Sequence, residues 1–148
     1  MLTRNDDGRL VLTKDAWARL RRVQSDANRT VTWTSDREVW GVEEKWDFPK
    51  DSGRGLVEDC DGISLWKMRR LIADGFPPEV LLLTICKTET DEGHAVLCVT
   101  TDRGDFILDN RHRDVVSFDG LKDKGYRFLY RAKLGGKLTG DWDKIKSI

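Results

Sequence analysis

The sequence predicts an α+β fold in which N-terminal helices pack on an antiparallel sheet. Residues 14–28 and 61–73 have the three-and-four spacing of apolar residues that is typical of helices. From residue 79 onward, short apolar runs alternate with turn residues, as in strands. Helices that precede the strands, rather than alternating with them, favour α+β over a parallel α/β arrangement.

Both helices have end signals in the sequence. Thr13 can cap the first helix, and Gly75 followed by two prolines can terminate the second. We expect the second helix to begin near Asp61. The apolar stripes are Ala16, Trp17, Leu20, Val23 and Ala27 in the first helix, and Ile63, Leu65, Trp66, Met68 and Ile72 in the second.

The segment between the helices predicts a short strand at 29–36 and then a long polar loop over 36–58. Loops of this length usually carry function or are disordered, and aromatic residues favour order. Trp40 and Trp46 are candidates for lining a cleft, and core packing explains each of them equally well.

The second half predicts an antiparallel sheet. Residues 79–88 form a nearly continuous apolar run, which indicates a strand buried on both faces. Residues 93–110 predict a strand, a turn at Asp102–Gly104 and a returning strand. Further strands are expected at 115–118 and 126–134, with a loop and a short element at the C-terminal end.

The length, the charge balance and the cysteine count of the chain exclude several classes of protein. A chain of 148 residues suits a single domain, 1–148. Lys+Arg and Asp+Glu both number 26, so the sequence lacks the basic excess of a nucleic-acid binder. No apolar run reaches the roughly 20 residues of a membrane helix, and the first residues lack the apolar core of a signal peptide. Three cysteines favour reduced thiols, so we expect a cytoplasmic location, and a small signal-free chain would also suit a phage or mobile element.

The 93–110 hairpin predicts a histidine–carboxylate pair. Alternation puts His94 on one face of its strand and Asp109 on the matching face of the return strand. A turn centred at 101–102 places the two directly opposite, with Cβ atoms roughly 4.5–5.5 Å apart. A shift of the centre by one residue makes them diagonal neighbours on the same face. In either register the carboxylate can fix the tautomer of the imidazole and favour its protonated form.

Cys60 is the candidate nucleophile. It lies at the expected helix start, where the helix dipole and a nearby imidazolium would lower the pKa of a thiol. Its neighbours Asp59 and Asp61 oppose thiolate formation unless they point away or bind a cation. The plainer interpretation of a lone cysteine is a small buried residue, which we expect for Cys86 and Cys98 in their apolar strands.

Other metal and titratable groups carry weaker signals. His112 is expected to be a solvated loop residue. The three cysteines and two histidines lack the close paired spacing of a zinc site.

Three ordered blocks, "EDCDGISLWKMRRLIADGFP", "GHAVLCV" and "FILDN", resemble the bacterial transglutaminase-like cysteine proteinases. That family includes periplasmic proteases that cut biofilm adhesins. The resemblance spans about residues 15–145 and implies a papain-like fold in its transglutaminase-like variant. It implies Cys60 as nucleophile, His94 as general base and acid, and Asp109 as orienting acid. Calcium-dependent members further imply Asp59 and Asp61 as calcium ligands; helix capping is the simpler alternative for these two residues.

We therefore expect a cysteine peptidase that acts on a protein or peptide substrate and needs no cofactor for its chemistry. The backbone N–H of Cys60 is the expected oxyanion donor. Transglutaminase or deamidase activity on glutamine side chains would use the same triad. A non-catalytic binding module that keeps the fold is the alternative from another class.

Overall fold

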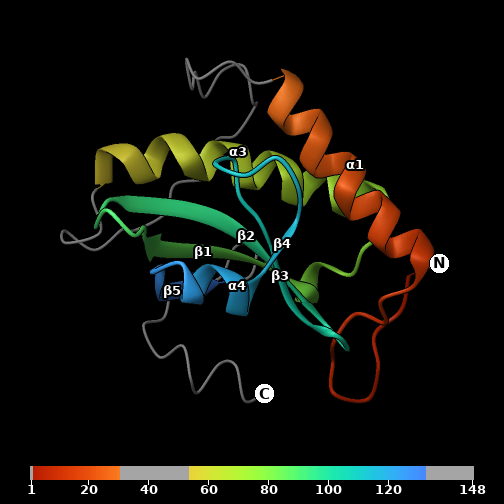
Figure 1. Ribbon diagram of the computed structural model, residues 1–148. Coiled ribbons are helices and arrows are strands. Elements are labelled where there is room, and N and C mark those ends of the chain that lie inside the picture. Colours follow the sequence, from red (N-terminus) through yellow and green to blue (C-terminus); the bar gives the residue numbers. More distant parts are fainter. Residues whose placement is uncertain (1, 31–53, 133–148) are drawn as a thin grey trace.

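The computed structural model describes residues 2–30 and 54–132 (Figure 1). Side chains at 28–30 and 54–62 lie outside this description, and these include Asp59, Cys60 and Asp61. Most of the expected strand at 29–36, the loop with Trp40 and Trp46, and the C-terminal segment from 133 also lie outside it. No helix in the described ranges is long and apolar enough to cross a membrane.

Helix α1 spans Lys14–Thr30 and confirms the first predicted helix. The side-chain oxygen of Thr13 accepts a hydrogen bond from the backbone N–H of Ala16 at 3.0 Å, so the predicted cap is formed. The inner stripe is buried as expected, and Trp17 at its edge is half-buried against Phe106, with ring centroids 5.0 Å apart. Because α1 extends to Thr30, the first two residues of the expected strand at 29–36 are helical instead.

Helix α3 spans Arg54–Ala73, so the predicted helix start near Asp61 is wrong. Residues 54–58, which were expected to belong to the loop, form the first turns of this helix. No proline lies between Pro49 and Arg54, so no proline prevents the helix from beginning at Arg54. The other end is as predicted: the backbone N–H of Gly75 donates to Ile72 at 3.0 Å, and Gly75 has φ +98°.

A five-stranded antiparallel sheet follows, in the order β4-β3-β2-β1-β5. A short 3-10 helix, η2, at Pro78–Val80 leads into it. Strand β2 is central and every residue in it is buried. The strands are β1 (Leu81–Lys87), β2 (Gly93–Thr101), β3 (Gly104–Leu108), β4 (Val116–Ser117) and β5 (Arg127–Ala132). The predicted antiparallel sheet and its hairpin are confirmed, and β1 is buried along most of its length as expected.

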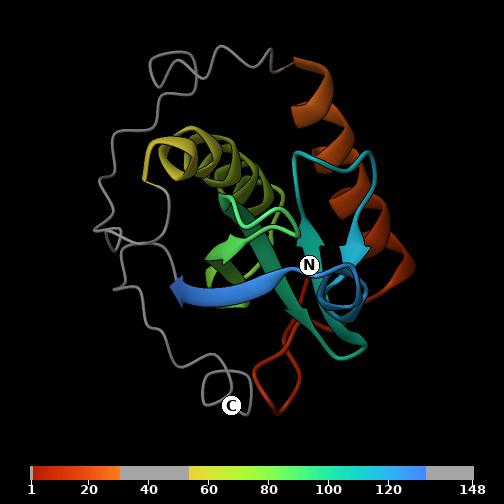
Figure 2. The ribbon, with the colours of Figure 1, turned by 60° about the vertical axis from the view of Figure 1, so that its left-hand side comes forward.

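The sheet has a helical layer on one face and a smaller cluster on the other. Helices α1 and α3 lie together on one face, and α4 (Phe118–Asp123) lies on the other (Figures 1 and 2). Strand alternation divides the core accordingly, with Ala95 and Leu97 facing α3 while Val96 and Cys98 belong to the α4 side. Helix α4 was not predicted: the strand expected at 115–118 ends at Ser117, which caps α4 by accepting a hydrogen bond from the N–H of Gly120.

Candidate active site

The side chains of His94 and Asp109 meet at one end of the β2–β3 hairpin. His94 Nε2 lies 2.6 Å from Asp109 Oδ1. Both side chains are almost fully buried, at 4% and 0% exposed. The hairpin pattern in the sequence therefore placed these two residues together correctly.

The hairpin adopts the diagonal register. Leu97 pairs with Leu108 and Thr101 with Gly104, so the hairpin centre lies one residue beyond 101–102. Continued along both chains, this register sets Asp109 opposite Val96, and His94 lies two positions further along its strand. A two-residue offset keeps both side chains on one face of the sheet.

Asp109 is held in its ionised form by several donors. Burial alone would raise the pKa of its carboxyl group, but the hydrogen bond and charge of His94, the backbone N–H of Arg111 and the hydroxyl of Tyr126 together lower that pKa to about 2. The Arg111 N–H donates to Oδ1 at 2.9 Å, and the Tyr126 hydroxyl donates to Oδ2 at 2.7 Å. Because an ionised carboxylate can only accept hydrogen bonds, His94 donates through Nε2–H, and Nδ1 is its basic nitrogen.

A second layer of contacts supports Tyr126. Arg111 Nη1 donates to the Tyr126 hydroxyl at 2.8 Å, and the Arg111 guanidinium forms a paired salt bridge with Glu89 on the β1–β2 turn. Burial and the neighbouring Asp109 charge raise the pKa of Tyr126, so its hydroxyl stays protonated and remains a donor. The sequence analysis missed Tyr126 and Arg111, because both lie in irregular segments whose spacing carries no signal for such contacts.

Strand β2 has an open edge beside the pair. The ladder to β3 ends at Leu97, so among the described strands the β3 side of residues 93–96 has no partner strand. The hydroxyl of Ser64 on α3 donates to the carbonyl oxygen of Ala95 at 3.3 Å, which brings α3 to this edge. Cys60 precedes Ser64 by four residues, so it occupies the same helix face one turn nearer the N-terminus, about 6 Å along the axis.

The early start of α3 removes two of the arguments made for Cys60. It is the seventh residue of the helix, beyond the first four N–H groups that lack intrahelical acceptors. The expected use of its backbone N–H as an oxyanion donor is therefore wrong for this helix. The helix dipole acts mainly within the first turn, so the dipole argument for Cys60 does not hold in this helix.

The other cysteines and His112 occupy structural positions. Cys86 and Cys98 are buried in β1 and β2 as predicted, and burial raises the pKa of the Cys98 thiol. His112 is not the solvated residue that was expected. Its side chain is 23% exposed and its Nε2 lies 3.7 Å from Asp109 Oδ2.

The described residues contain no cluster of three or more His, Cys, Asp or Glu suited to a metal ion. Asp59 and Asp61 lie in α3, two residues apart. Their side chains lie outside the described residues, so their expected role as calcium ligands stays a prediction. The capping alternative for Asp59 fails, because the helix begins at Arg54.

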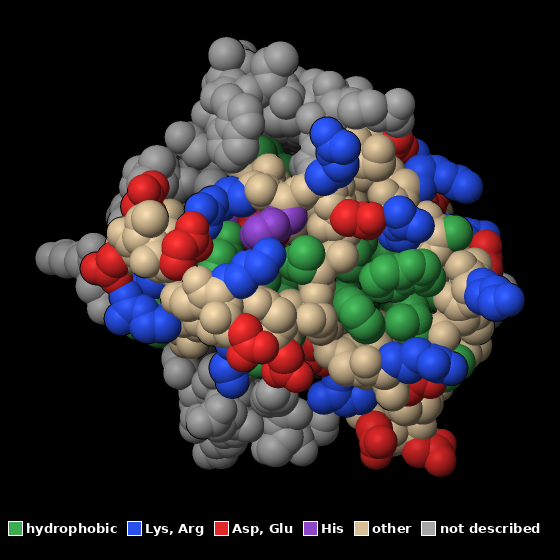
Figure 3. All heavy atoms as spheres, viewed as in Figure 1, with side chains coloured by type: hydrophobic (Ala, Val, Ile, Leu, Met, Phe, Trp, Pro, Cys, Tyr) green, Lys and Arg blue, Asp and Glu red, His purple; other side chains and the backbone are tan. Residues whose placement is uncertain are grey.

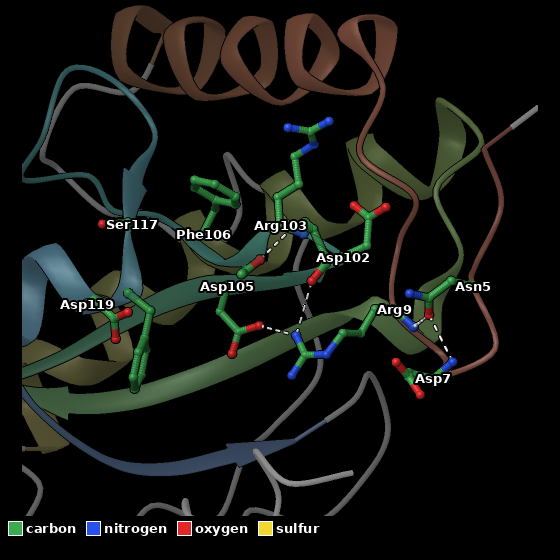
Figure 4. A pocket seen from close by; sticks show the side chains of 12 residues that line it. Asn5, Asp7, Arg9, Asp102, Arg103, Asp105, Phe106, Ser117 and Asp119 are labelled. Atoms are coloured by element: carbon green, nitrogen blue, oxygen red, sulfur yellow. Dashed lines mark hydrogen bonds and ion pairs between the residues drawn. The ribbon is translucent and has the colours of Figure 1, made fainter.

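A cavity of about 380 Å³ lies at the far end of the hairpin, around the Thr101–Gly104 turn. Arg9 reaches across it from the N-terminal segment to Asp105, with 2.6 Å between Nη1 and Oδ1 (Figure 4). None of the predicted site residues lines this cavity. The molecular face in Figure 3 carries Lys and Arg interspersed with Asp and Glu, with no continuous basic patch.

Comparisons with known proteins give a family model that matches this chain and solved structures with a similar fold. The family model described as bacterial transglutaminase-like cysteine proteinase matches residues 2–147. Calcium-bound LapG of Legionella pneumophila superposes with a TM-score of 0.59 at 22% identity, covering 88% of this chain and 78% of LapG. EGTA-treated LapG gives a TM-score of 0.56 at 21% identity, covering 88% and 77%. These likenesses confirm the predicted α+β, transglutaminase-like fold. A search of curated proteins finds no match.

Proposed function

We propose that this chain, which belongs to the bacterial transglutaminase-like cysteine proteinases, cleaves peptide bonds with a triad of Cys60, His94 and Asp109. Membership makes it a cysteine protease that acts on protein substrates. The observation that carries the triad is the buried 2.6 Å contact between His94 and Asp109. His94 alternates with Ala95 and shares the α4 side of the sheet with Val96, so a residue of α3 reaches it only around the open edge of β2. The hydrogen bond of Ser64 to Ala95 brings α3 to that edge, which supports Cys60 as the third member.

The proposed reaction begins with transfer of the Cys60 Sγ proton to His94 Nδ1. The thiolate attacks the peptide carbonyl carbon, and the carbonyl π electrons move to its oxygen. The intermediate collapses, the C–N bond breaks, and the His94 imidazolium gives its proton to the leaving amine. Water, deprotonated by His94, then attacks the thioester; the C–S bond breaks, and Cys60 is released with the carboxylic acid product. Asp109 holds Nε2–H throughout, which keeps Nδ1 basic and stabilises the imidazolium.

The decisive experiment uses a peptide library from a bacterial proteome, analysed by mass spectrometry. The wild-type protein should produce new peptide ends, while Cys60→Ala and His94→Ala should remove nearly all cleavage. Asp109→Asn should reduce cleavage less completely, because the imidazole loses its orienting charge but remains present.

Other outcomes separate the alternatives. Glutamine deamidation or crosslinked peptides that depend on Cys60 would indicate a deamidase or a transglutaminase. A Cys60 that reacts with iodoacetamide no faster than a denatured thiol, with no product of any kind, would indicate a binding module. Cleavage by Cys60→Ala at the wild-type rate would contradict the triad.

Calcium is a separate prediction. A calcium-bound structure exists for LapG, but the described residues hold no group of three or more His, Cys, Asp or Glu that could complete a calcium shell beside Asp59 and Asp61. Calcium is therefore not used in the proposed reaction. We expect excess calcium and EGTA to give the same melting temperature and the same alkylation rate of Cys60. A calcium-induced rise in either quantity that Asp61→Asn abolishes would show that these carboxylates bind the ion and that the start of α3 rearranges.

A further inference from the structure

A buried lysine and a buried glutamine connect α3 to the turn that carries Asp109. Lys67 of α3 is 1% exposed and Gln24 of α1 is 0% exposed. Lys67 Nζ donates to Gln24 Oε1 at 2.7 Å. Gln24 Nε2 in turn donates to the carbonyl oxygens of Asp109 at 2.8 Å and His112 at 2.9 Å.

The stability of the α1–α3 contact does not account for an ammonium group at this position. Lysine is rarely buried completely, because removing its charge from water is costly. Replacing a buried polar or ionic group with a well-packed apolar side chain of similar volume often leaves the stability of a protein unchanged or raises it. The hydrogen bond of Lys67 is directional. It therefore fixes the position of α3 along its own axis more strictly than apolar packing does.

The helix geometry ties this direction to the site. Lys67 follows Cys60 by seven residues, so the two positions share a face of α3 about 10 Å apart along the axis. Gln24, which accepts the hydrogen bond of Lys67, donates to the backbone carbonyl oxygen of Asp109, and the carboxylate of Asp109 binds His94. The path therefore joins the nucleophile helix to the histidine–carboxylate pair through two side chains.

We propose that Lys67 and Gln24 are positioning residues that fix where Cys60 lies along the α3 axis relative to His94. The proposal rests on the proposed function, in which these two groups exchange a proton. Such alignment matters because a misplacement of about 1 Å can reduce a reaction rate on the order of 100-fold. The bridge acts through α3 and the Asp109 turn, and neither residue touches the reacting atoms.

Gln24→Glu separates positioning from simple helix packing. The variant keeps an acceptor for Lys67 and nearly the same volume, but it replaces the amide donor with an oxygen that cannot donate to the two carbonyls. Lys67→Met removes the ammonium, and Lys67→Arg restores a donor. Arg70→Gln is the matched control, since it breaks another α1–α3 contact, Arg70 to Asp26 at 3.2 Å, that does not involve the Asp109 turn.

The measurement is the rate at which iodoacetamide alkylates each cysteine in the folded protein, followed across pH by peptide mapping. Gln24→Glu and Lys67→Met should each slow labelling of Cys60 near neutral pH by about 10- to 100-fold and move its midpoint to higher pH, because thiolate formation loses the nearby imidazolium. Lys67→Arg should recover part of the rate. Arg70→Gln should stay within about twofold of wild type, because the partly buried Arg70–Asp26 contact does not involve the Asp109 turn.

Each contrary outcome has a distinct meaning. A wild-type pH profile of Cys60 in Gln24→Glu and Lys67→Met overturns the proposal and leaves the triad intact. Labelling of buried Cys86 or Cys98 in these variants overturns it as well, because the bridge then holds the fold and not the site. A wild-type Cys60 with the profile of an ordinary thiol, together with no peptide cleavage, removes the proposed function itself.

Discussion

Asp109 has more donors around its carboxylate than a histidine partner alone would supply. The His94 ring and the Arg111 N–H occupy one oxygen, and the Tyr126 hydroxyl occupies the other. Each oxygen of a buried carboxylate needs such donors, because an unsatisfied charged group in the interior costs stability. At the residue scale, Tyr126 fixes the rotation of the carboxylate that His94 depends on.

Replacing Tyr126 with Phe tests this role. The change leaves Asp109 Oδ2 and the Arg111 guanidinium each without their hydroxyl partner, so we expect a loss of about 1–3 kcal/mol in the free energy of unfolding, measured by urea denaturation. Peptide cleavage should also fall, because the carboxylate becomes free to turn. Tyr130→Phe on the neighbouring strand is the control and should leave cleavage unchanged. Equal effects from the two substitutions would contradict the role of Tyr126.

At the scale of elements, the features that depend on local sequence patterns could be predicted, and those that depend on long-range contacts could not. The β2–β3 hairpin could be predicted because alternation and the Asp102–Gly104 turn are local patterns, and the His94–Asp109 contact follows from them. The beginning of α3 could not be located, because the residues before Asp61 carry no signal that stops a helix. Tyr126 could not be assigned either, since the fold brings it to Asp109 from 17 residues away.

The end of α3 supplies a prediction at this scale. Gly75 has φ +98°, a conformation that disfavours side chains, and no atom lies within 4 Å of the position a Cβ would occupy. Gly75→Ala should therefore lower the free energy of unfolding by about 1–2 kcal/mol through backbone strain alone. Gly75→Asn should lose less, because Asn tolerates positive φ better. Chemical denaturation of the three proteins checks this order, and an alanine variant as stable as wild type would exclude the strain.

At the scale of the whole molecule, the ionisation of Asp109 makes the free energy of unfolding depend on pH under acidic conditions. Its pKa of about 2 in the folded protein lies below the ordinary value of 3.8, so folding favours the ionised form. The resulting stabilisation is complete above about pH 4 and is lost as the pH falls through about 2. The shift corresponds to roughly 2 kcal/mol.

This linkage can be measured by comparing urea unfolding of wild type and Asp109→Asn from pH 7 to pH 2. The difference in unfolding free energy should stay constant at neutral pH and shrink below pH 4, because the wild type then loses its carboxylate. Glu89→Gln is the control: the pKa of Glu89 is also lowered to about 2, but its salt bridge with Arg111 is exposed and should contribute little. A difference that does not change with pH would contradict the linkage.

The contacts around Asp109 span most of the described chain. Gln24 is separated from Asp109 by 85 residues, His94 by 15 and Tyr126 by 17. During synthesis the segment with Tyr126 leaves the ribosome long after Gln24, and long-range contacts of this kind form late in folding. A nascent chain that ends before Tyr126 lacks the hydroxyl that binds Asp109 Oδ2, so the set of donors around this carboxylate is complete only after Tyr126 has been synthesised.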